Sequence, residues 1–136
     1  MDKRTRQRAQ HLKTVFRQAN SLNAMAHLLK TDARKLHLLA QQPRYKTFTI
    51  PKKGGGERLI ETPGNDLKRV LHRLNSYLQA TYYFERSHAA FGFILGVKND
   101  ADRRNVHTNA RKHVGRDYLL NIDLKNFFHT VTREQV

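Results

Sequence analysis

The sequence predicts an α+β fold, because the hydrophobic period changes along the chain. Apolar residues recur at helical spacing through residues 1–42. Residues 45–50, Tyr-Lys-Thr-Phe-Thr-Ile, are then rich in aromatic and β-branched side chains, which are typical of a strand. A second extended run at 58–62 and a long amphipathic stretch from Asp66 complete the pattern. We therefore expect a helical N-terminal segment, a β-hairpin and a long helix, in that order.

The composition indicates a polyanionic partner. The chain has 136 residues, with 26 lysines and arginines against 11 aspartates and glutamates, and a formal net charge of +15. Such a charge favours nucleic acid as the partner, ahead of an acidic membrane. There is no cysteine, which excludes disulfides, cysteine-ligated zinc and a thiol nucleophile and is typical of the reducing cytoplasm, where we expect the protein. The longest apolar run, residues 89–97, is too short for a membrane span, so no membrane partner is expected.

The N-terminal segment predicts short helices separated by capping residues. Ser21 and Thr31 are of the residue types that cap helices, and each precedes apolar residues at helical spacing. We expect two short helices up to residue 29 and a third that begins at the Thr31 cap and ends at Pro43. Residues 24–36 also have the helix, turn and helix order of a helix-turn-helix DNA-binding module.

A basic, glycine-tipped hairpin is expected next. Between the two strands the chain reads Pro-Lys-Lys-Gly-Gly-Gly-Glu over residues 51–57. Glycine accepts the positive φ values that a reversing loop needs. Lys52, Lys53 and Arg58, with the backbone N–H groups of the loop, can converge on a triphosphate. An isolated hairpin with this tip is more often simply solvated, and the loop lacks the Gly-Lys-Ser/Thr ending of a P-loop.

The region after the hairpin contains the most regular helical pattern of the chain. We expect a helix capped by Asn65 or Asp66, with apolar residues along one side and basic residues opposite them. The apolar stretch at 87–97 has no clear period because glycines interrupt it. A further helix is expected over residues 100–113, ended by Gly115.

The C-terminal part predicts a buried strand that ends in a carboxylate. Residues 118–123, Tyr-Leu-Leu-Asn-Ile-Asp, have the apolar pattern of a strand buried on both faces, and Asp123 lies at its C-terminal end. A carboxylate there suits a divalent metal, and the turn after it offers a carbonyl and N–H groups around a phosphate. An aspartate after a strand is more often a turn or capping residue, and two-metal phosphoryl transfer needs a further carboxylate. Thr132 and Gln135 then fit a capping box.

Several segments of the chain occur together in a specific order. They are the Lys-Lys-Gly-Gly-Gly-Glu-Arg-Leu-Ile hairpin within 45–63, the helix from Asp66, Ala-Phe-Gly-Phe at 90–93, Asn-Ala-Arg-Lys-His-Val-Gly at 109–115 and Leu-Asn-Ile-Asp-Leu-Lys-Asn-Phe-Phe at 120–128. In this order they resemble the first part of a bacterial retron-type reverse transcriptase. The resemblance implies an RNA-directed DNA polymerase shaped as a right hand, with a helical N-terminal region over 1–42, fingers over 43–116 and the first palm strand over 117–136.

The resemblance implies roles for residues of the palm. Asp123 matches the first metal-binding aspartate, and Leu124 matches the neighbour whose backbone carbonyl faces the two Mg²⁺ ions. Asn126 and Phe127 match the turn whose N–H groups meet the incoming triphosphate. Phe128 matches the aromatic steric gate that excludes a 2′-hydroxyl.

The resemblance implies substrate contacts in the fingers as well. Arg58 and one of Lys52 or Lys53 match the residues that clasp the triphosphate, and the loop length allows either lysine. Ile60 lies where the family packs against the templating base. The implied partners are deoxynucleoside triphosphates, a structured RNA template and the RNA–DNA hybrid.

One departure from the family concerns the rest of the palm. The Tyr-x-Asp-Asp motif has no counterpart before the sequence ends at Val136. We therefore expect this chain alone to be inactive, with a missing C-terminal part or a second chain completing the palm and thumb. Two binding-only alternatives stay open, the helix-turn-helix module and a non-catalytic protein that holds a structured RNA on its basic surface.

Overall fold

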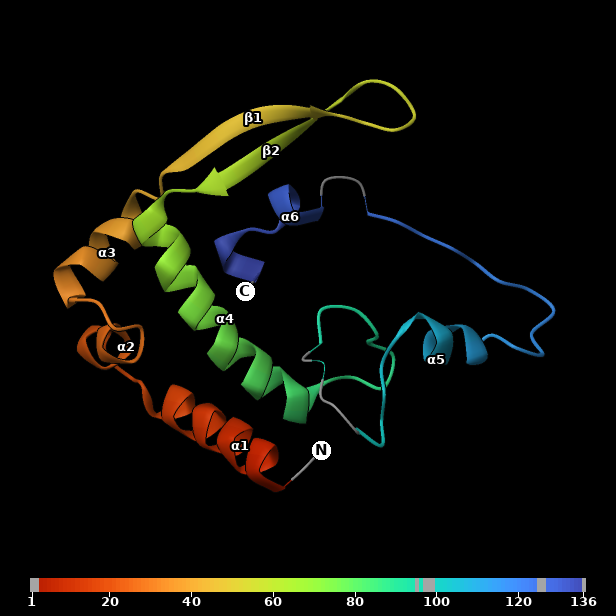
Figure 1. Cartoon of the computed structure of the whole chain (residues 1–136), viewed down its shortest axis with the longest axis horizontal. Helices are drawn as coiled ribbons and strands as arrows, with labels where there is room; N and C mark the ends of the chain where they lie inside the picture. The colour runs from red at the N-terminus through yellow and green to blue at the C-terminus, as the bar shows by residue number, and fades with distance from the viewer. Residues whose placement is uncertain (1–2, 95, 97–99, 125–126, 136) are drawn as a thin grey trace. The chain divides into compact units, whose positions relative to one another are not determined.

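The computed structural model describes residues 3–94, 96, 100–124 and 127–135 (Figure 1). The chain divides into two compact units, Met1–Arg104 and Asn105–Val136. The predicted α+β composition is confirmed, with helices and one antiparallel hairpin in the described residues. The elements are α1 (Lys3–Gln18), α2 (Leu22–Leu28), α3 (Ala33–Gln41), β1 (Tyr45–Pro51), β2 (Glu57–Pro63), α4 (Asn65–Glu85), α5 (Val106–Arg111), α6 (Phe127–Thr130) and the 3₁₀ turn η1 (Arg133–Gln135). No helix in the described ranges is long and apolar enough to cross a membrane.

Side-chain caps set the starts of α2 and α3. The Ser21 hydroxyl accepts a hydrogen bond from the Ala24 N–H at 3.2 Å, so the predicted cap of α2 is confirmed. The predicted Thr31 cap of α3 is wrong by one residue. The Asp32 carboxylate accepts from the Lys35 N–H at 2.7 Å, and a charged acceptor at this position also interacts favourably with the helix dipole.

The core of the N-terminal unit lies where α2 and α3 pack against α4. Ala26, Leu29, Leu36 and Val70 are buried together, and Leu29 is 2% exposed. Burial of such aliphatic side chains is the main favourable term for a unit of this size. The two short helices therefore depend on α4 for their apolar contacts.

Helix α1 packs along the C-terminal half of α4. Phe16 and Tyr77 stack with their ring centroids 5.8 Å apart. The Glu85 carboxylate accepts from Lys13 at 3.0 Å and from Arg17 at 2.5 Å. The basic helix is thus held by an aromatic contact and by the one carboxylate that ends α4.

The hairpin and the start of α4 are built around glycines. Gly55 and Gly56 have φ values of 89° and 80°, as expected of a reversing loop. Gly64 stands at the N-cap of α4 without a side-chain cap bond, so the prediction of a cap by Asn65 or Asp66 is wrong. The Asp66 carboxylate, in the first turn of α4, instead pairs with Lys35 of α3 and with Arg69 of α4.

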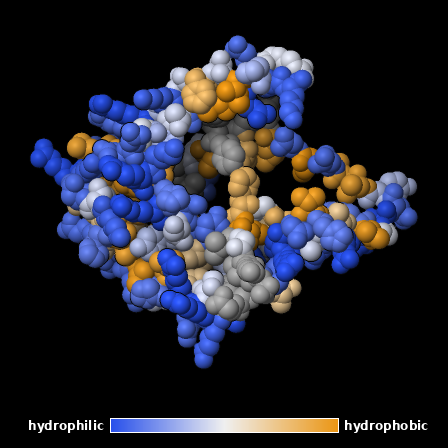
Figure 2. Space-filling view, viewed as in Figure 1, coloured by the Kyte–Doolittle hydropathy of each residue, from blue (hydrophilic) through white to orange (hydrophobic). Residues whose placement is uncertain are grey.

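The C-terminal unit departs most from expectation. Helix α5 is shorter than the predicted helix over 100–113, although Gly115, with φ of 76°, follows it as expected. Residues 118–123 form no strand, and their apolar side chains are exposed, up to 95% for Tyr118. A strand needs a hydrogen-bonded neighbour, and in the described residues β1 and β2 pair only with each other. Figure 2 shows hydrophobic side chains at the surface along this unit.

The last turn of the chain agrees in part with the predicted capping box. The Thr132 N–H donates to the Gln135 side-chain oxygen at 2.7 Å, which is one of the two reciprocal bonds of that motif. Only the short 3₁₀ turn η1 follows it in the described residues.

Leu29→Ala tests whether the α2–α3–α4 contact carries the stability of the unit. Removing this buried side chain leaves a cavity, so we expect a loss of about 2 to 5 kcal/mol in the free energy of unfolding. Chemical denaturation followed by circular dichroism measures it. Leu38→Ala on α3 is the control, because Leu38 is 53% exposed and its truncation should cost much less.

Candidate functional site

The hairpin gathers the residues predicted to hold a nucleotide on one exposed face. Phe48 pairs with Ile60 and Ile50 pairs with Arg58 across β1 and β2. Because side chains alternate along a strand, these four side chains lie on the same face. Phe48 and Ile50 are 49% and 39% exposed. Arg58 and Ile60 therefore stand beside each other on an open, partly apolar strip.

The two lysines of the loop lie just beyond this strip. The Lys52 N–H donates to the Gly56 carbonyl at 3.0 Å, and the Lys52 carbonyl accepts from the Gly55 N–H at 3.1 Å. Both lysine side chains are exposed. The backbone of Lys52 is therefore fixed by the turn, while Lys53 stands at its tip.

The predicted metal residues are not assembled into a site. Asp123 and Leu124 lie in an exposed segment without regular secondary structure. The Asp123 carboxylate is a suitable Mg²⁺ ligand, but one carboxylate does not make a two-ion site. Among the described residues no three His, Cys, Asp or Glu side chains gather closely enough to hold a metal ion. The described part of the chain therefore does not provide a complete Mg²⁺ site.

The turn after Asp123 is only partly described. Asn126 lies outside the described residues, and Phe128 falls within the short helix α6. The Phe127 N–H donates to the Leu124 carbonyl at 3.3 Å. The Phe127 N–H, predicted to meet the triphosphate, and the Leu124 carbonyl, predicted to face the metal ions, are therefore hydrogen-bonded to each other.

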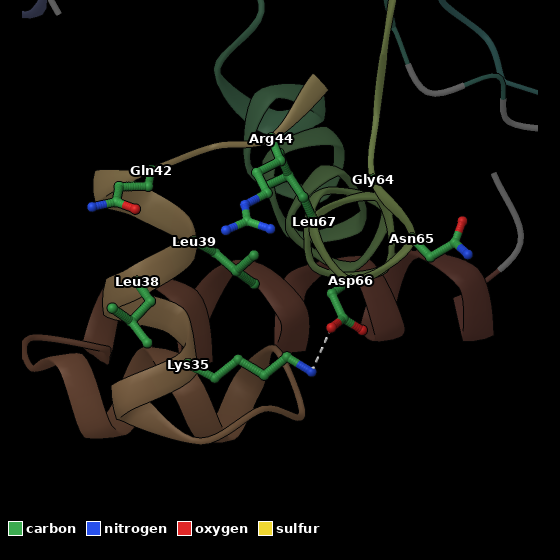
Figure 3. Close-up of a pocket in the computed structure, with 9 residues that line it drawn as sticks. All are labelled: Lys35, Leu38, Leu39, Gln42, Arg44, Gly64, Asn65, Asp66 and Leu67. Atoms are coloured by element: carbon green, nitrogen blue, oxygen red, sulfur yellow. Dashed lines mark ion pairs between the residues drawn. The ribbon is translucent and has the colours of Figure 1, made fainter. Parts of the chain in front are cut away.

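A hollow of about 540 Å³ lies between α3, the base of the hairpin and the start of α4 (Figure 3). The Lys35 ammonium and the Asp66 carboxylate pair at its edge, 2.8 Å apart. Burial opposes ionisation, but hydrogen bonds from Lys35 and then Arg69 dominate and lower the pKa of Asp66. The remaining lining residues are Leu38, Leu39, Gln42, Arg44, Gly64, Asn65 and Leu67.

Comparison with known proteins gives the family. The chain is 36% identical over 105 residues to the retron Mx65 reverse transcriptase of Myxococcus xanthus, which covers 74% of this chain and 22% of that protein. It is 32% identical over 123 residues to the retron Mx162 reverse transcriptase of the same organism, covering 86% of this chain and 24% of that protein. The chain belongs to the retron reverse transcriptases. It is also 28% identical to the retron Ec86 reverse transcriptase of Escherichia coli over 121 residues, 86% of this chain and 35% of that enzyme.

The chain thus spans about a quarter of the length of the Mx65 and Mx162 proteins. No protein-family model matches it, and neither does any solved structure. The match to these relatives confirms the family that the ordered motifs predicted.

One cluster of charged side chains was missed by reasoning from the sequence. Arg104 donates to both oxygens of Asp102, at 2.8 Å from Nε and 2.7 Å from Nη2. Arg86 reaches Asp100 at 3.3 Å and Asp102 at 3.2 Å, and the Tyr83 hydroxyl donates to Asp100 at 2.9 Å. The signal in the sequence for this network was the run Asp-Ala-Asp-Arg-Arg at 100–104, in which two arginines follow two aspartates.

The network holds the irregular segment after α4. Arg104 Nη1 lies 3.0 Å from the carbonyl oxygens of Ser87 and His88 and 2.8 Å from that of Ala90. Its guanidinium carbon is also 5.1 Å from the centroid of the Phe91 ring. One guanidinium therefore organises the segment that contains the Ala-Phe-Gly-Phe motif, a task that its planar, multi-donor geometry suits.

The ion pairs of this network predict an acid-sensitive contribution to stability. Hydrogen bonds from Arg104, and then from Arg86, lower the pKa of Asp102 from 3.8 to about 2. A carboxylate with a depressed folded-state pKa stabilises the fold above its unfolded pKa, and the stabilisation is lost as the pH falls toward 2. Asp102→Asn should lower stability at neutral pH and reduce the further loss between about pH 4 and about pH 2.

Urea denaturation midpoints across that pH range measure the effect. Asp117→Asn is the matched control, since Asp117 is exposed and makes no ion pair in the described part of the chain. A pH dependence in Asp102→Asn that equals the unmodified chain contradicts the assignment of the network.

Proposed function

We propose that this chain forms the fingers and the first palm segment of a retron-type RNA-directed DNA polymerase. The carrying observation is the identity to retron reverse transcriptases over most of the chain. The grouping of Arg58 and Ile60 on one exposed hairpin face, with two lysines at its tip, supports the same proposal. In the reaction, directed by an RNA template, a primer hydroxyl loses its proton and attacks the α-phosphate of a deoxynucleoside triphosphate, the bond from the α-phosphorus to the bridging oxygen breaks, and pyrophosphate leaves.

The hairpin binds the incoming nucleotide in this proposal. Arg58 presents a planar fork of donors that matches phosphate oxygens, and Lys52 or Lys53 adds a second cation beyond it. Ile60 lies beside Phe48 and gives an apolar surface for the templating base. Because this face is open to solvent, a nucleotide and template can reach it without rearrangement of the strands.

Asp123 is proposed as one carboxylate ligand of the polymerase's Mg²⁺ site, with the Leu124 carbonyl beside it. When bound, the metal stabilises charge that develops during nucleotidyl transfer. The turn at Asn126 and Phe127 is proposed to meet the triphosphate through backbone N–H groups, with Phe128 under the sugar. We propose that a C-terminal part or a second chain supplies a further carboxylate, because a two-ion site needs more than Asp123.

Residues 118–123 are proposed to become a palm strand when further strands pair with them. The exposure of Tyr118 at 95%, Leu120 at 84% and Ile122 at 75% leaves an apolar surface of the kind that proteins bury. A C-terminal part of the same polymerase or a second chain can supply the neighbouring strands. RNA template, RNA–DNA hybrid and deoxynucleoside triphosphates are the partners of the completed enzyme.

Asp123→Asn tests the polymerase proposal in a full-length retron polymerase that carries this sequence. We expect primer extension on an RNA template to disappear because a neutral amide is a poor Mg²⁺ ligand. Thermal unfolding should stay close to the parent, since Asp123 is exposed. Asp117→Asn is the matched control and should extend primers normally. Normal extension by Asp123→Asn would remove Asp123 from the site.

Phe128→Ala tests the proposed steric gate in the same full-length enzyme. A ring under the deoxyribose excludes the 2′-hydroxyl by its volume, so its removal should raise ribonucleotide incorporation far more than it lowers deoxynucleotide incorporation. The ratio of the two incorporation rates measures the effect. A residue that only packs in a core instead predicts a loss of stability of about 3 to 5 kcal/mol and an unchanged ratio.

A further inference from the structure

A basic groove runs along the N-terminal half of α4, beside the turn that joins α2 to α3. Two hollows, of about 190 Å³ and about 840 Å³, share Asp66, Arg69 and Arg73 in their walls and so adjoin each other along this part of α4. Its charged lining comes from the turn, from α3 and from α4. These residues are Lys30, Lys35, Asp66, Lys68, Arg69 and Arg73.

The groove has an excess of positive charge that the chain does not cancel. Five of the charged lining residues are cations and one is an anion, which gives a formal charge of +4 from 5 − 1. The Asp66 carboxylate pairs with Lys35 and with Arg69. Lys30 and Lys68 are exposed and make no ion pair within the described ranges. A polyanion can therefore bind here without first displacing a partner from these two lysines.

The Arg73 side chain is positioned by hydrogen bonds to uncharged backbone carbonyls, so these contacts do not neutralise its positive charge. Its Nη1 lies 2.8 Å from the Leu29 carbonyl oxygen and 3.1 Å from the Lys30 carbonyl oxygen. These acceptors are uncharged carbonyls, and within the described ranges Arg73 forms no ion pair, so no carboxylate there offsets the guanidinium charge. The side chain is therefore pre-ordered beside the exposed lysines, which lowers the entropic cost of binding an anion.

We propose that this groove binds the phosphodiester backbone of a nucleic-acid strand, an inference that rests on the proposed function and deepens it. Clustered arginines and lysines suit a run of phosphates. The described lining contains no Phe, Tyr or Trp on which a base could stack. Contacts to phosphates carry no sequence information, so we expect the groove to bind strands of different sequence, at a place distinct from the hairpin face proposed for the nucleotide.

The first experiment measures binding of a short, mixed-sequence, single-stranded RNA to the 136-residue chain by fluorescence anisotropy. Salt is varied from about 50 to about 200 mM, over which affinity should fall steeply. Lys30→Gln combined with Lys68→Gln should weaken binding about 25-fold, since each lost contact is worth about fivefold, or about 1 kcal/mol. The salt slope should fall by about 1.4, at about 0.7 for each phosphate contact on a single strand.

The matched control removes two exposed cations outside the groove, Arg8→Gln combined with Arg34→Gln. It lowers the net charge by the same amount and should change affinity far less. Parallel titrations with DNA of the same sequence identify the strand. If the Lys30→Gln, Lys68→Gln variant loses affinity equally for RNA and DNA, or for RNA alone, the result supports the groove. A loss for RNA alone also identifies the bound strand as the RNA template.

A second pair of variants changes the affinity in the opposite direction. Asp66→Asn removes the only carboxylate among the described residues of the groove lining and releases Lys35 and Arg69, so RNA binding should tighten severalfold. Glu85→Gln is its control, because Glu85 also pairs with two cations, Lys13 and Arg17, away from the groove. Circular dichroism confirms that both variants remain folded.

The outcomes separate this inference from the proposed function. Equal losses in the groove and control double variants, or equal gains in Asp66→Asn and Glu85→Gln, would mean that charge acts without a defined groove and would overturn the inference alone. No binding of RNA or DNA by the unmodified chain at low salt would overturn both the groove and nucleic-acid binding by this segment. Tighter binding of an acidic peptide than of RNA would assign the groove to a protein partner and also overturn the inference.

Discussion

The docking of the α2–α3 turn onto α4 is the contact on which the N-terminal unit depends. Leu29 is 2% exposed beneath the turn, Arg73 donates to the last carbonyls of α2 and its turn, and the Tyr77 hydroxyl donates to the Leu28 carbonyl at 3.3 Å. Short helices are marginal alone and gain stability from such packing. Because β2 ends one residue before the cap of α4, the same contact also fixes where the hairpin leaves the unit.

Local patterns in the sequence predicted the order of elements well, but not always the residue that begins each one. The prediction of Ser21 as the cap of α2 was correct because its hydroxyl accepts from the Ala24 N–H, three residues along the chain. Thr31 was wrong because Asp32, the next residue, offers a charged acceptor, and a pattern of capping residue types does not rank neighbours. At α4 the cap is Gly64, and the Asp66 carboxylate instead pairs with Lys35 of α3 and with Arg69, three residues further along α4.

The candidate site was predictable where it is local and not where it requires distant partners. Strand alternation places Arg58 and Ile60 together, and the register of β1 against β2 agrees with it. The strand at 118–123 is absent because apolar residues specify a strand only when neighbours pair with them, and the described residues offer none. The Arg86–Arg104 network was missed for a related reason, since its geometry depends on carbonyls that an irregular loop brings together.

The hairpin is the part of the N-terminal unit with the least burial. Every residue of β1 is exposed, and in β2 Ile60, Thr62 and Pro63 are half-buried while the other residues are exposed. Two strands without a covering layer are marginally stable, and local opening costs less than global unfolding. The hairpin joins the unit at its base, where the Gly64 N–H donates to the Arg44 carbonyl at 2.9 Å. Because the hairpin is attached at its base, a small rotation there displaces the loop that carries Lys52 and Lys53 more than any other part of the hairpin.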